Sequence, residues 1–437
     1  MATHPKDGGA RVAYINARLL DPESGHDGPG ALLTQGGVIA DLGPHLFNDG
    51  VPDGIEVIDC AGKCLAPGLV DMRVQLRDPG EEHKETIGTA SAAAAAGGVT
   101  AMVCLPNTDP VIDDVAAVEF VARRAREVRG AKVFCYAAAT RDLAGSELTE
   151  MGLLSETGAL GFTDGTKAIA NARVMQRALL YARTFGALIV QHPEEPALVG
   201  EGAMNAGEVA LRLGLSGIPA VAEVMMIERD LRLVEMTGGR YHAAHVSTGE
   251  GVAAIRRAKD KGLNVTCDTA PPYFTLNESA VGEYRTFAKL SPPLRSEADR
   301  AGVVAGLADG TIDAIASDHS PHDQDSKRLP FAQAEFGAIG LETLLPLSLA
   351  LYHKGEMTLI DVLKRLTVAP AHILGLPLGR LKKGAAADLV LFDLDRPWVV
   401  DADTFHSKSK NTPFDEWPVQ GQVLRTAVAG RTLFAAE

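Results

Sequence analysis

The chain of 437 residues has no excess of positive charge. Its 42 lysines and arginines are outnumbered by 56 aspartates and glutamates, and the formal net charge is −14. Nucleic acids and anionic membranes attract basic surfaces, so neither is expected as the main partner. No apolar run approaches the ~18 residues of a membrane span, and the first ten residues lack the basic-then-apolar pattern of a secretory signal. We therefore expect a cytoplasmic protein.

Paired cysteines are also missing. None of the five cysteines belongs to a C-x-x-C motif, and most lie in apolar, strand-like runs: Cys60, Cys64, Cys104, Cys135 and Cys267. A structural zinc site or a thiol redox motif would need closely spaced pairs. The pattern therefore indicates buried free thiols in a reducing compartment.

Helical periodicity is missing at both ends of the chain. Residues 11–65 consist of short strand-like segments that are broken by glycine, proline and aspartate, and residues 376–437 have the same character. Chain termini often lie close together in space. We therefore predict that residues 1–65 and 376–437 combine into one small β-sandwich domain.

Strand and helix signals alternate over residues 66–375. The strand-like VTAMVCLP precedes the helix-like DVAAVEFVARRAREVRG, and similar pairs recur along this region. Eight such units would close a (β/α)₈ barrel of the TIM type. A doubly wound open sheet is the alternative, but no G-x-G-x-x-G motif follows the first strand. The predicted fold class is therefore α/β, a barrel with a satellite domain built from both chain ends.

Polar side chains stand at the ends of the predicted barrel strands. The segment VDMRVQLR, residues 70–77, alternates apolar and polar residues, so one strand face must line something wet or charged. The reactive face of a TIM barrel lies at the C-terminal ends of its strands. The polar residues at these ends are Arg73, Gln75, Arg77, Asn107, Asp164, His192, His245 and Asp318, with His322 in the loop beyond.

Imidazole and carboxylate groups at successive strand ends are typical ligands of a catalytic zinc ion. Such an ion activates water and polarises a carbonyl group, and a carboxylate such as Asp318 can carry the proton. Arg77 and Asn107 are candidates for holding a substrate carboxylate. The alternative, in which each polar group serves only its own loop, stays open. The candidate metal ligands are His192, His245, Asp164 and Asp318.

Several sequence blocks resemble a known family. The chain contains, in this order, APGLVDMRVQLRDPGEEHKETI, AAAAGGVTAMVCLPNT, GFTDG, QHPEE, AHVST, KLSPPLR, ASDHSPH, GLETLLPL and SKSKNTPF. They resemble the type I dihydroorotases of the amidohydrolase superfamily over nearly the whole chain. The resemblance implies a metal-dependent barrel that converts carbamoyl aspartate to dihydroorotate in pyrimidine biosynthesis. By position, it implies metal ligation by His192, His245, Asp164 and Asp318, proton transfer by Asp318, and substrate contacts from Arg77, Asn107 and His322.

The first-strand ligands of that family are replaced in this chain. Arg73 and Gln75 stand where relatives carry the His-x-His pair that grips the more buried metal. Arginine cannot ligate a metal, because its guanidinium stays protonated. Ser291 stands where the family usually has an asparagine that touches the substrate. We hypothesise that Arg73 replaces the charge of the missing metal and bonds to Asp164, Asp318 or both, since unneutralised carboxylates in a partly buried pocket are costly.

Three functions are compatible with this pattern. The first is a dihydroorotase homologue with impaired or lost activity that acts as a scaffold for aspartate transcarbamoylase. The second is an active single-metal dihydroorotase that uses His192 and His245, so at most one Zn²⁺ is expected, or none. The third is a hydantoinase- or allantoinase-like hydrolase, whose carboxylated lysine would have to be Lys167. Relatives commonly form dimers or larger assemblies, which implies a homo-oligomer. The SKSKNTPF segment, residues 407–414, is predicted to be a solvated loop.

Overall fold

A ring of parallel strands forms the centre of the molecule in the computed structural model, which describes residues 10–436. Two groups of hydrogen-bonded parallel strands make most of this ring. Phe162 joins the two groups on one side, because it pairs with both Ala137 and Ile189. Val74 pairs with His319 and joins them on the other side. The strands are β6 (Leu69–Val74), β7 (Val99–Cys104), β8 (Lys132–Cys135), β9 (Leu188–Gln191), β12 (Arg240–Ala243), β13 (Val265–Thr269) and β14 (Ala314–Ile315).

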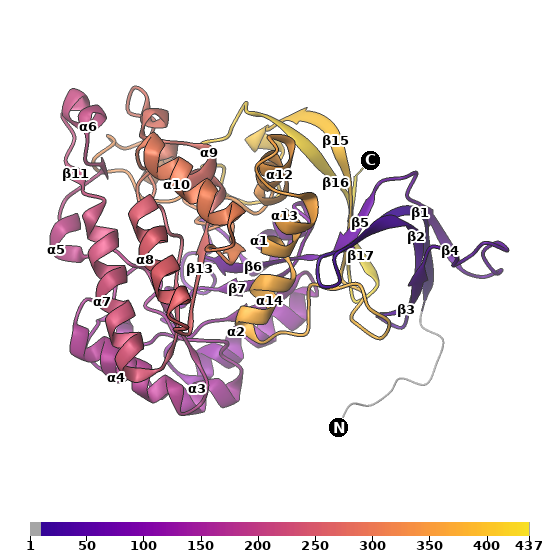
Figure 1. Cartoon of the computed structure of the whole chain (residues 1–437), viewed down its shortest axis with the longest axis horizontal. Coiled ribbons are helices and arrows are strands. Elements are labelled where there is room, and N and C mark those ends of the chain that lie inside the picture. The colour runs from indigo at the N-terminus through magenta and orange to yellow at the C-terminus, as the bar shows by residue number, and fades with distance from the viewer. Residues whose placement is uncertain (1–9, 437) are drawn as a thin grey trace.

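Helices cover the outside of this ring (Figure 1). The longer ones are α1 (Ile87–Ala96), α2 (Val115–Val128), α4 (Ala172–Arg183), α7 (Val221–Thr237), α8 (Gly249–Asp260), α10 (Glu297–Ala308), α12 (Leu344–His353) and α13 (Leu359–Leu366). Shorter ones are α3 (Met151–Thr157), α5 (Pro196–Val199), α6 (Glu208–Leu213), α9 (Pro271–Thr275), α11 (Gln324–Lys327) and α14 (Val368–Leu374). A small ladder, β10 (Met204–Asn205) with β11 (Gly217–Ile218), lies between α5 and α7. None of the helices within residues 10–436 is both long and apolar enough to span a membrane.

Local sequence explains where several helices begin and end. Asp114 caps α2 by accepting a hydrogen bond from the backbone of Ala117, and the buried Val118 and Val121 anchor the helix on the ring. The alanine-rich α1 ends at Gly97, where a Cβ atom would lie 2.0 Å from the Leu341 carbonyl oxygen. The helix-like pattern of residues 114–130 therefore predicted α2 well, because its signals are local.

The two chain ends form one mixed sheet beside the barrel, at the right of Figure 1. Its order is β17-β16-β15-β5-β1-β2-β3, with β4 paired to β1. The bounds are β1 (Arg11–Asp21), β2 (His26–Gln35), β3 (Val38–Gly43), β4 (Glu56–Asp59), β5 (Cys64–Pro67), β15 (Leu389–Val399), β16 (Pro418–Val428) and β17 (Arg431–Ala435). The union of both ends is confirmed. The hydrogen-bonded strands make a single sheet where a β-sandwich was predicted, and the domain limits at 65 and 376 stay predictions.

Both faces of β6 are buried, including its polar residues. Asp71 is 0% exposed and Arg73 only 2%. The polar face of VDMRVQLR therefore points into the barrel, as the alternation predicted. The prediction of a solvated loop at residues 407–414 is wrong, because Ser407, Asn411 and Thr412 are buried.

Candidate active site

A buried guanidinium lies at the centre of the candidate site. The Nε of Arg73 donates to Oδ1 of Asp318 over 2.8 Å, and Nη2 donates to the carbonyl oxygen of Gly165 over 3.3 Å. Its third nitrogen, Nη1, has no hydrogen-bond partner among residues 10–436. Arg73 thus bonds to Asp318, as hypothesised, and on its other side it reaches a backbone carbonyl rather than Asp164.

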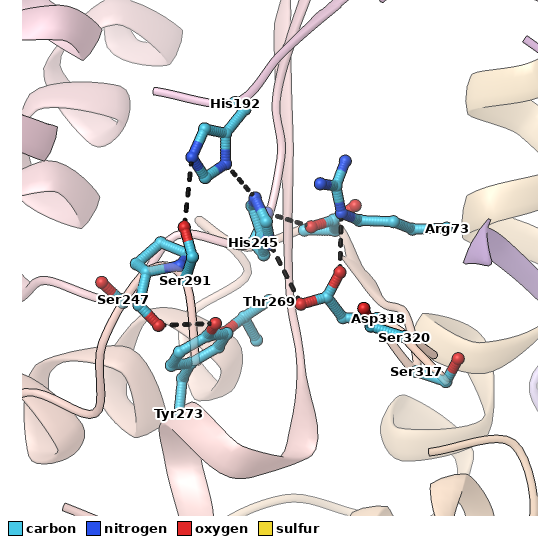
Figure 2. Close-up of polar contacts among 12 residues, drawn as sticks. Arg73, His192, His245, Ser247, Thr269, Tyr273, Ser291, Ser317, Asp318 and Ser320 are labelled. Atoms are coloured by element: carbon cyan, nitrogen blue, oxygen red, sulfur yellow. Dashed lines mark hydrogen bonds and ion pairs between the residues drawn. The ribbon is translucent and has the colours of Figure 1, made fainter. Parts of the chain in front are cut away.

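Two histidines continue this line of contacts (Figure 2). His245 Nδ1 lies 3.2 Å from Oδ2 of Asp318, and His245 Nε2 lies 2.7 Å from Nδ1 of His192. Burial and the nearby Arg73 guanidinium lower the pKa of His245 to about 4, so its ring is neutral at pH 7. The Nδ1–H of this neutral ring donates to Asp318, and its Nε2 accepts from His192.

The charge of Arg73 also affects Asp318. Burial raises the pKa of this carboxyl, but the His245 ring and the Arg73 guanidinium outweigh burial and hold the pKa below its usual value. Asp318 is therefore ionised at neutral pH. A carboxylate with a lowered pKa is a weaker base, which bears directly on its predicted role as a proton carrier.

The Gln75 side chain forms a hydrogen-bonded bridge across the barrel mouth. Gln75 donates from Nε2 to the hydroxyl of Ser320 over 2.8 Å, and it accepts from Nδ2 of Asn107 over 2.9 Å. The amide therefore connects the ends of β6 and β7 to the loop after β14. Asn107, a predicted substrate contact, lies at this bridge.

Asp164 hydrogen-bonds to Thr140 rather than to Arg73. Its two oxygens accept from the backbone nitrogen of Thr140 over 2.9 Å and from the Thr140 hydroxyl over 2.6 Å. Burial raises the pKa of Asp164. The predicted role of Asp164 as a metal bridge stays a prediction, and its contacts in this structure are those of a loop anchor.

Arg77 and His322, two of the predicted substrate contacts, lie side by side. The Nη2 of Arg77 is 3.2 Å from Nε2 of His322, while Nη1 donates to Glu81 over 2.8 Å and Nε donates to the Pro321 carbonyl over 3.2 Å. Burial and the Arg77 charge lower the pKa of His322 to about 2. His322 is therefore a neutral group beside a fixed cation, at a position suited to an anionic ligand.

Arg73, Arg77 and Asp318 line one cavity of about 330 Å³, whereas the candidate metal ligands His192, His245 and Asp164 do not belong to its lining. Two larger grooves, of about 720 and 640 Å³, lie on the terminal sheet and between α12 and the β15–β16 strands, and neither contains a predicted site residue. The chemistry of the lining therefore identifies the smaller cavity as the site. Its lining includes Arg73, Gln75, Arg77, Lys84, Asn107, Ser291, Asp318, Ser320, His322 and Gly337.

Sequence reasoning missed a carboxylate behind His192. Oε2 of Glu194 accepts from the hydroxyl of Ser291 over 2.8 Å and lies 3.2 Å from Nε2 of His192, and Oε1 lies 3.4 Å from Nη2 of Arg295. Burial raises the pKa of Glu194, but these neighbours outweigh burial and lower it to about 2. The signal was present in the QHPEE block, where a carboxylate follows the histidine by two residues.

The predicted ligand set does not fit a metal ion in this arrangement. Within residues 10–436, no group of three or more His, Cys, Asp or Glu side chains is placed to share an ion. The donors instead contact one another or Arg73, since a nitrogen of His192 faces His245 and the Asp318 carboxylate faces the guanidinium.

The fold is that of solved hydantoinase and dihydropyrimidinase structures. An L-hydantoinase (dihydropyrimidinase) from Arthrobacter aurescens superposes with a TM-score of 0.86 at 26% identity, over 97% of this chain and 96% of that chain. A dihydropyrimidinase from Brevibacillus agri NCHU1002 gives a TM-score of 0.83 at 22% identity, over 97% and 95% of the two chains, and shows the fold alone.

Sequence comparison identifies the family more narrowly. A family model described as dihydro-orotase-like matches residues 62–251. A dihydroorotase of Wolbachia sp. subsp. Drosophila simulans (strain wRi) is 49% identical over 428 residues, which are 98% of this chain and 96% of that relative. A dihydroorotase of Anaplasma phagocytophilum (strain HZ) is 49% identical over 432 residues, with the same shares. The chain belongs to the dihydroorotase family.

Proposed function

We propose that this chain acts in pyrimidine biosynthesis, that it binds dihydroorotate or carbamoyl aspartate in the barrel mouth, and that its metal-dependent turnover is impaired or lost. One observation carries the proposal: the buried Arg73 guanidinium, at a position where the family resemblance implies a metal ligand, is ion-paired with Asp318. A fixed cation at this place repels Zn²⁺ and neutralises the carboxylate that a metal would need.

Retained anion contacts support ligand binding. Arg77 keeps free N–H groups beyond its bonds to Glu81 and Pro321, and it lines the cavity with Asn107. Arginine binds carboxylates in a planar fork, and the neutral His322 beside it adds no competing charge. A volume of about 330 Å³ suits a small cyclic or branched carboxylate.

Weak proton transfer follows from the same ion pair. Asp318 is the predicted proton carrier, and Arg73 together with His245 lowers its pKa. Proton abstraction by a weaker base is slower, in line with Brønsted behaviour. The loss of activity therefore rests on both metal repulsion and the reduced basicity of Asp318.

The second candidate is a single-metal dihydroorotase. It is favoured by the close approach of His192 and His245, whose facing nitrogens are 2.7 Å apart, with Oδ2 of Asp318 on the far side of the His245 ring. Zinc would compete with the hydrogen bond between these two rings. A hydantoinase-like site based on a carboxylated lysine has less support, because Lys167 is exposed.

The proposed partner is aspartate transcarbamoylase, for which the barrel would serve as a scaffold, and the proposed assembly is a homo-oligomer. The support for both is the family resemblance together with the altered site. Co-elution of the two purified proteins in size-exclusion chromatography with light scattering tests the partner. Elution of each protein at its own mass would contradict it.

The first experiment measures metal content and dihydroorotate hydrolysis on the same sample, with and without added Zn²⁺. Calorimetric titration with dihydroorotate is performed in parallel. We expect little metal, little turnover and measurable binding, and we expect the Arg77→Met variant to lose the binding. Arg232→Met, at an exposed position, is the matched control. Stoichiometric zinc with clear turnover would establish the single-metal enzyme instead, and absence of binding would refute the proposal.

A further inference from the structure

A segment near the C-terminus reaches into the mouth of the barrel. Residues 407–412, which we call the strap, lie between the terminal sheet strands β15 and β16. Although the strap is rich in serine, lysine and asparagine, Ser407, Ser409 and Asn411 are exposed by only 2–5%. Buried polar side chains need hydrogen-bond partners, so these partners indicate what the strap does.

Asn411 bonds to both loops that border the cavity on one side. Its Nδ2 donates to the carbonyl oxygens of Ser320 and Gly337, over 3.0 and 3.1 Å, and its Oδ1 accepts from the backbone nitrogen of His322 over 3.0 Å. The backbone carbonyl of Asn411 also accepts from Ile339 over 3.0 Å. One amide therefore fixes the spacing between the loop after β14 and the cavity wall at Gly337.

This spacing is tight. A Cβ atom on Gly337, whose φ is +124°, would lie 2.4 Å from the hydroxyl oxygen of Ser320. The Phe336 carbonyl, next to this glycine, lies 2.8 Å from Nε2 of His322. The orientation of the His322 ring against Arg77 therefore depends on how close the two loops are held.

The first half of the strap holds the opposite wall. The Ser409 hydroxyl donates to the Lys84 carbonyl over 2.7 Å, and Nζ of Lys408 donates to the Glu82 carbonyl over 2.7 Å. The Ser407 hydroxyl bonds to the buried Glu85. The same loop carries Glu81, the partner of Arg77.

We propose that Asn411 is a positioning residue of the cavity in which Arg77 would bind a carboxylate. Asn411 holds the His322 ring and the cavity wall at Gly337 at the distance from Arg77 that ligand binding requires. The proposal rests on the proposed function, since it assigns a residue to the same pocket. Asparagine is suited to this place because one amide both donates and accepts, whereas aspartate would turn acceptors toward two carbonyl oxygens.

Calorimetric titration of the Asn411→Ala and Asn411→Asp variants with dihydroorotate tests the proposal. Each variant should bind roughly tenfold more weakly or worse, because buried carbonyls lose their donor. Asn171→Asp, at an exposed helix cap that aspartate fills equally well, should bind within about twofold of the parent. Binding unchanged in both Asn411 variants would overturn the proposal.

A double-mutant cycle separates positioning from general destabilisation. Combined with His322→Asn, the Asn411→Ala change should weaken binding less than it does alone, because both act through the same ring. Fully additive effects would overturn the proposal. Leu363→Ala, a core change in α13, serves as the control for lost stability alone. If this variant lost as much affinity for dihydroorotate as Asn411→Ala does, the proposal would also be overturned.

A measurement on the ligand-free protein keeps the proposal distinct from the proposed function. Nitrogen-15 spectra of labelled histidine side chains should show a shifted His322 signal in Asn411→Ala and an unchanged His192 signal. If the parent protein does not bind dihydroorotate, the proposed function fails, while this spectrum still tests Asn411. An unshifted His322 signal would overturn the positioning role.

Discussion

Arg73 is a buried charge that the barrel tolerates only through its partner. Its side chain is 2% exposed, and its ion pair with Asp318 is the main compensation that the structure provides. A buried ion pair adds little stability relative to apolar residues, but removal of one partner leaves an uncompensated charge and is strongly destabilising. The pair is therefore better understood as a fixed electrostatic element of the site than as a source of stability.

Replacement of Arg73 by methionine should lower the free energy of unfolding by about 3 kcal/mol at pH 7. The pKa of Asp318 is depressed in the folded protein, so its contribution is present above the unfolded pKa and is lost as pH falls through the folded pKa. Without Arg73 that pKa rises, and the destabilisation should shrink toward pH 4. Urea unfolding at the two pH values measures this, with Arg232→Met as the control. An equal loss at both pH values would contradict the ion-pair account.

Glu194 should make the free energy of unfolding fall as the pH is lowered into the acid range. Its folded pKa of about 2 lies below the ordinary value of 4.5, so its contribution of about 3 kcal/mol is present above the unfolded pKa and is lost as pH falls toward 2. In Glu194→Gln this acid-dependent loss should be absent, whereas the exposed Glu147→Gln should unfold like the parent. Denaturant midpoints between pH 5 and pH 3 measure the difference, and parallel curves for parent and Glu194→Gln would refute it.

At the scale of elements, structure that depends on neighbouring residues was predicted better than structure that depends on residues far apart in the chain. The helix at 115–128 agrees with the sequence, since its cap and its apolar spacing lie within one segment. The GFTDG block forms only single bridges at Phe162 rather than a regular strand. The strap was predicted wrongly because its partners, such as Ser320 and Lys84, are about 90 and more than 300 residues away.

The site residues show the same contrast between local patterns, which the sequence reveals, and contacts between distant segments, which it does not. Alternation in VDMRVQLR correctly placed Arg73 and Gln75 inside the barrel, because a period of two is a local property. The contact of Asp164 with Thr140 depends on two strand ends that meet only in the folded chain. Such pairings cannot be obtained from spacing alone.

The loop from His322 to Gly340 contains a buried lysine with a perturbed pKa. Nζ of Lys327, in α11, donates to the carbonyl of Glu335 over 2.6 Å, and burial together with the nearby Lys289 lowers its pKa to about 7. The unfolded chain keeps this proton up to pH ~10. Since the unfolded state then binds more protons than the folded state, stability should rise with pH above 7.

The Lys327→Met variant should lack this rise. Between pH 7 and pH 10 the parent should gain about 3 kcal/mol of unfolding free energy relative to Lys327→Met. The exposed Lys261→Met controls for the loss of one positive charge. Urea unfolding at pH 7, 8, 9 and 10 measures the difference, and equal slopes for parent and Lys327→Met would show that the buried amine does not titrate in this range.

At the scale of the whole molecule, the two chain ends connect the terminal sheet to the barrel mouth. The alternating pattern predicted the α/β class, and the β character of both ends predicted their union in one sheet. The strap adds a link that the pattern did not reveal, since the C-terminal part of the chain also borders the cavity. The strap therefore joins the terminal sheet to the pocket through the chain itself and through the hydrogen bonds of Asn411 and Ser409.

Metal removal tests the charge balance of the whole site. Because Arg73 provides the central positive charge, treatment with EDTA should leave Tm unchanged, and saturating dihydroorotate should raise Tm equally with and without EDTA. Arg73→His combined with Gln75→His introduces the imidazole pair that the family resemblance implies at these positions and should gain zinc, with a Tm that EDTA lowers. Gln176→His combined with Arg232→His, at two positions outside the site, is the matched control. A fall in the Tm of the parent on chelation would show that a metal, rather than Arg73, holds the site together.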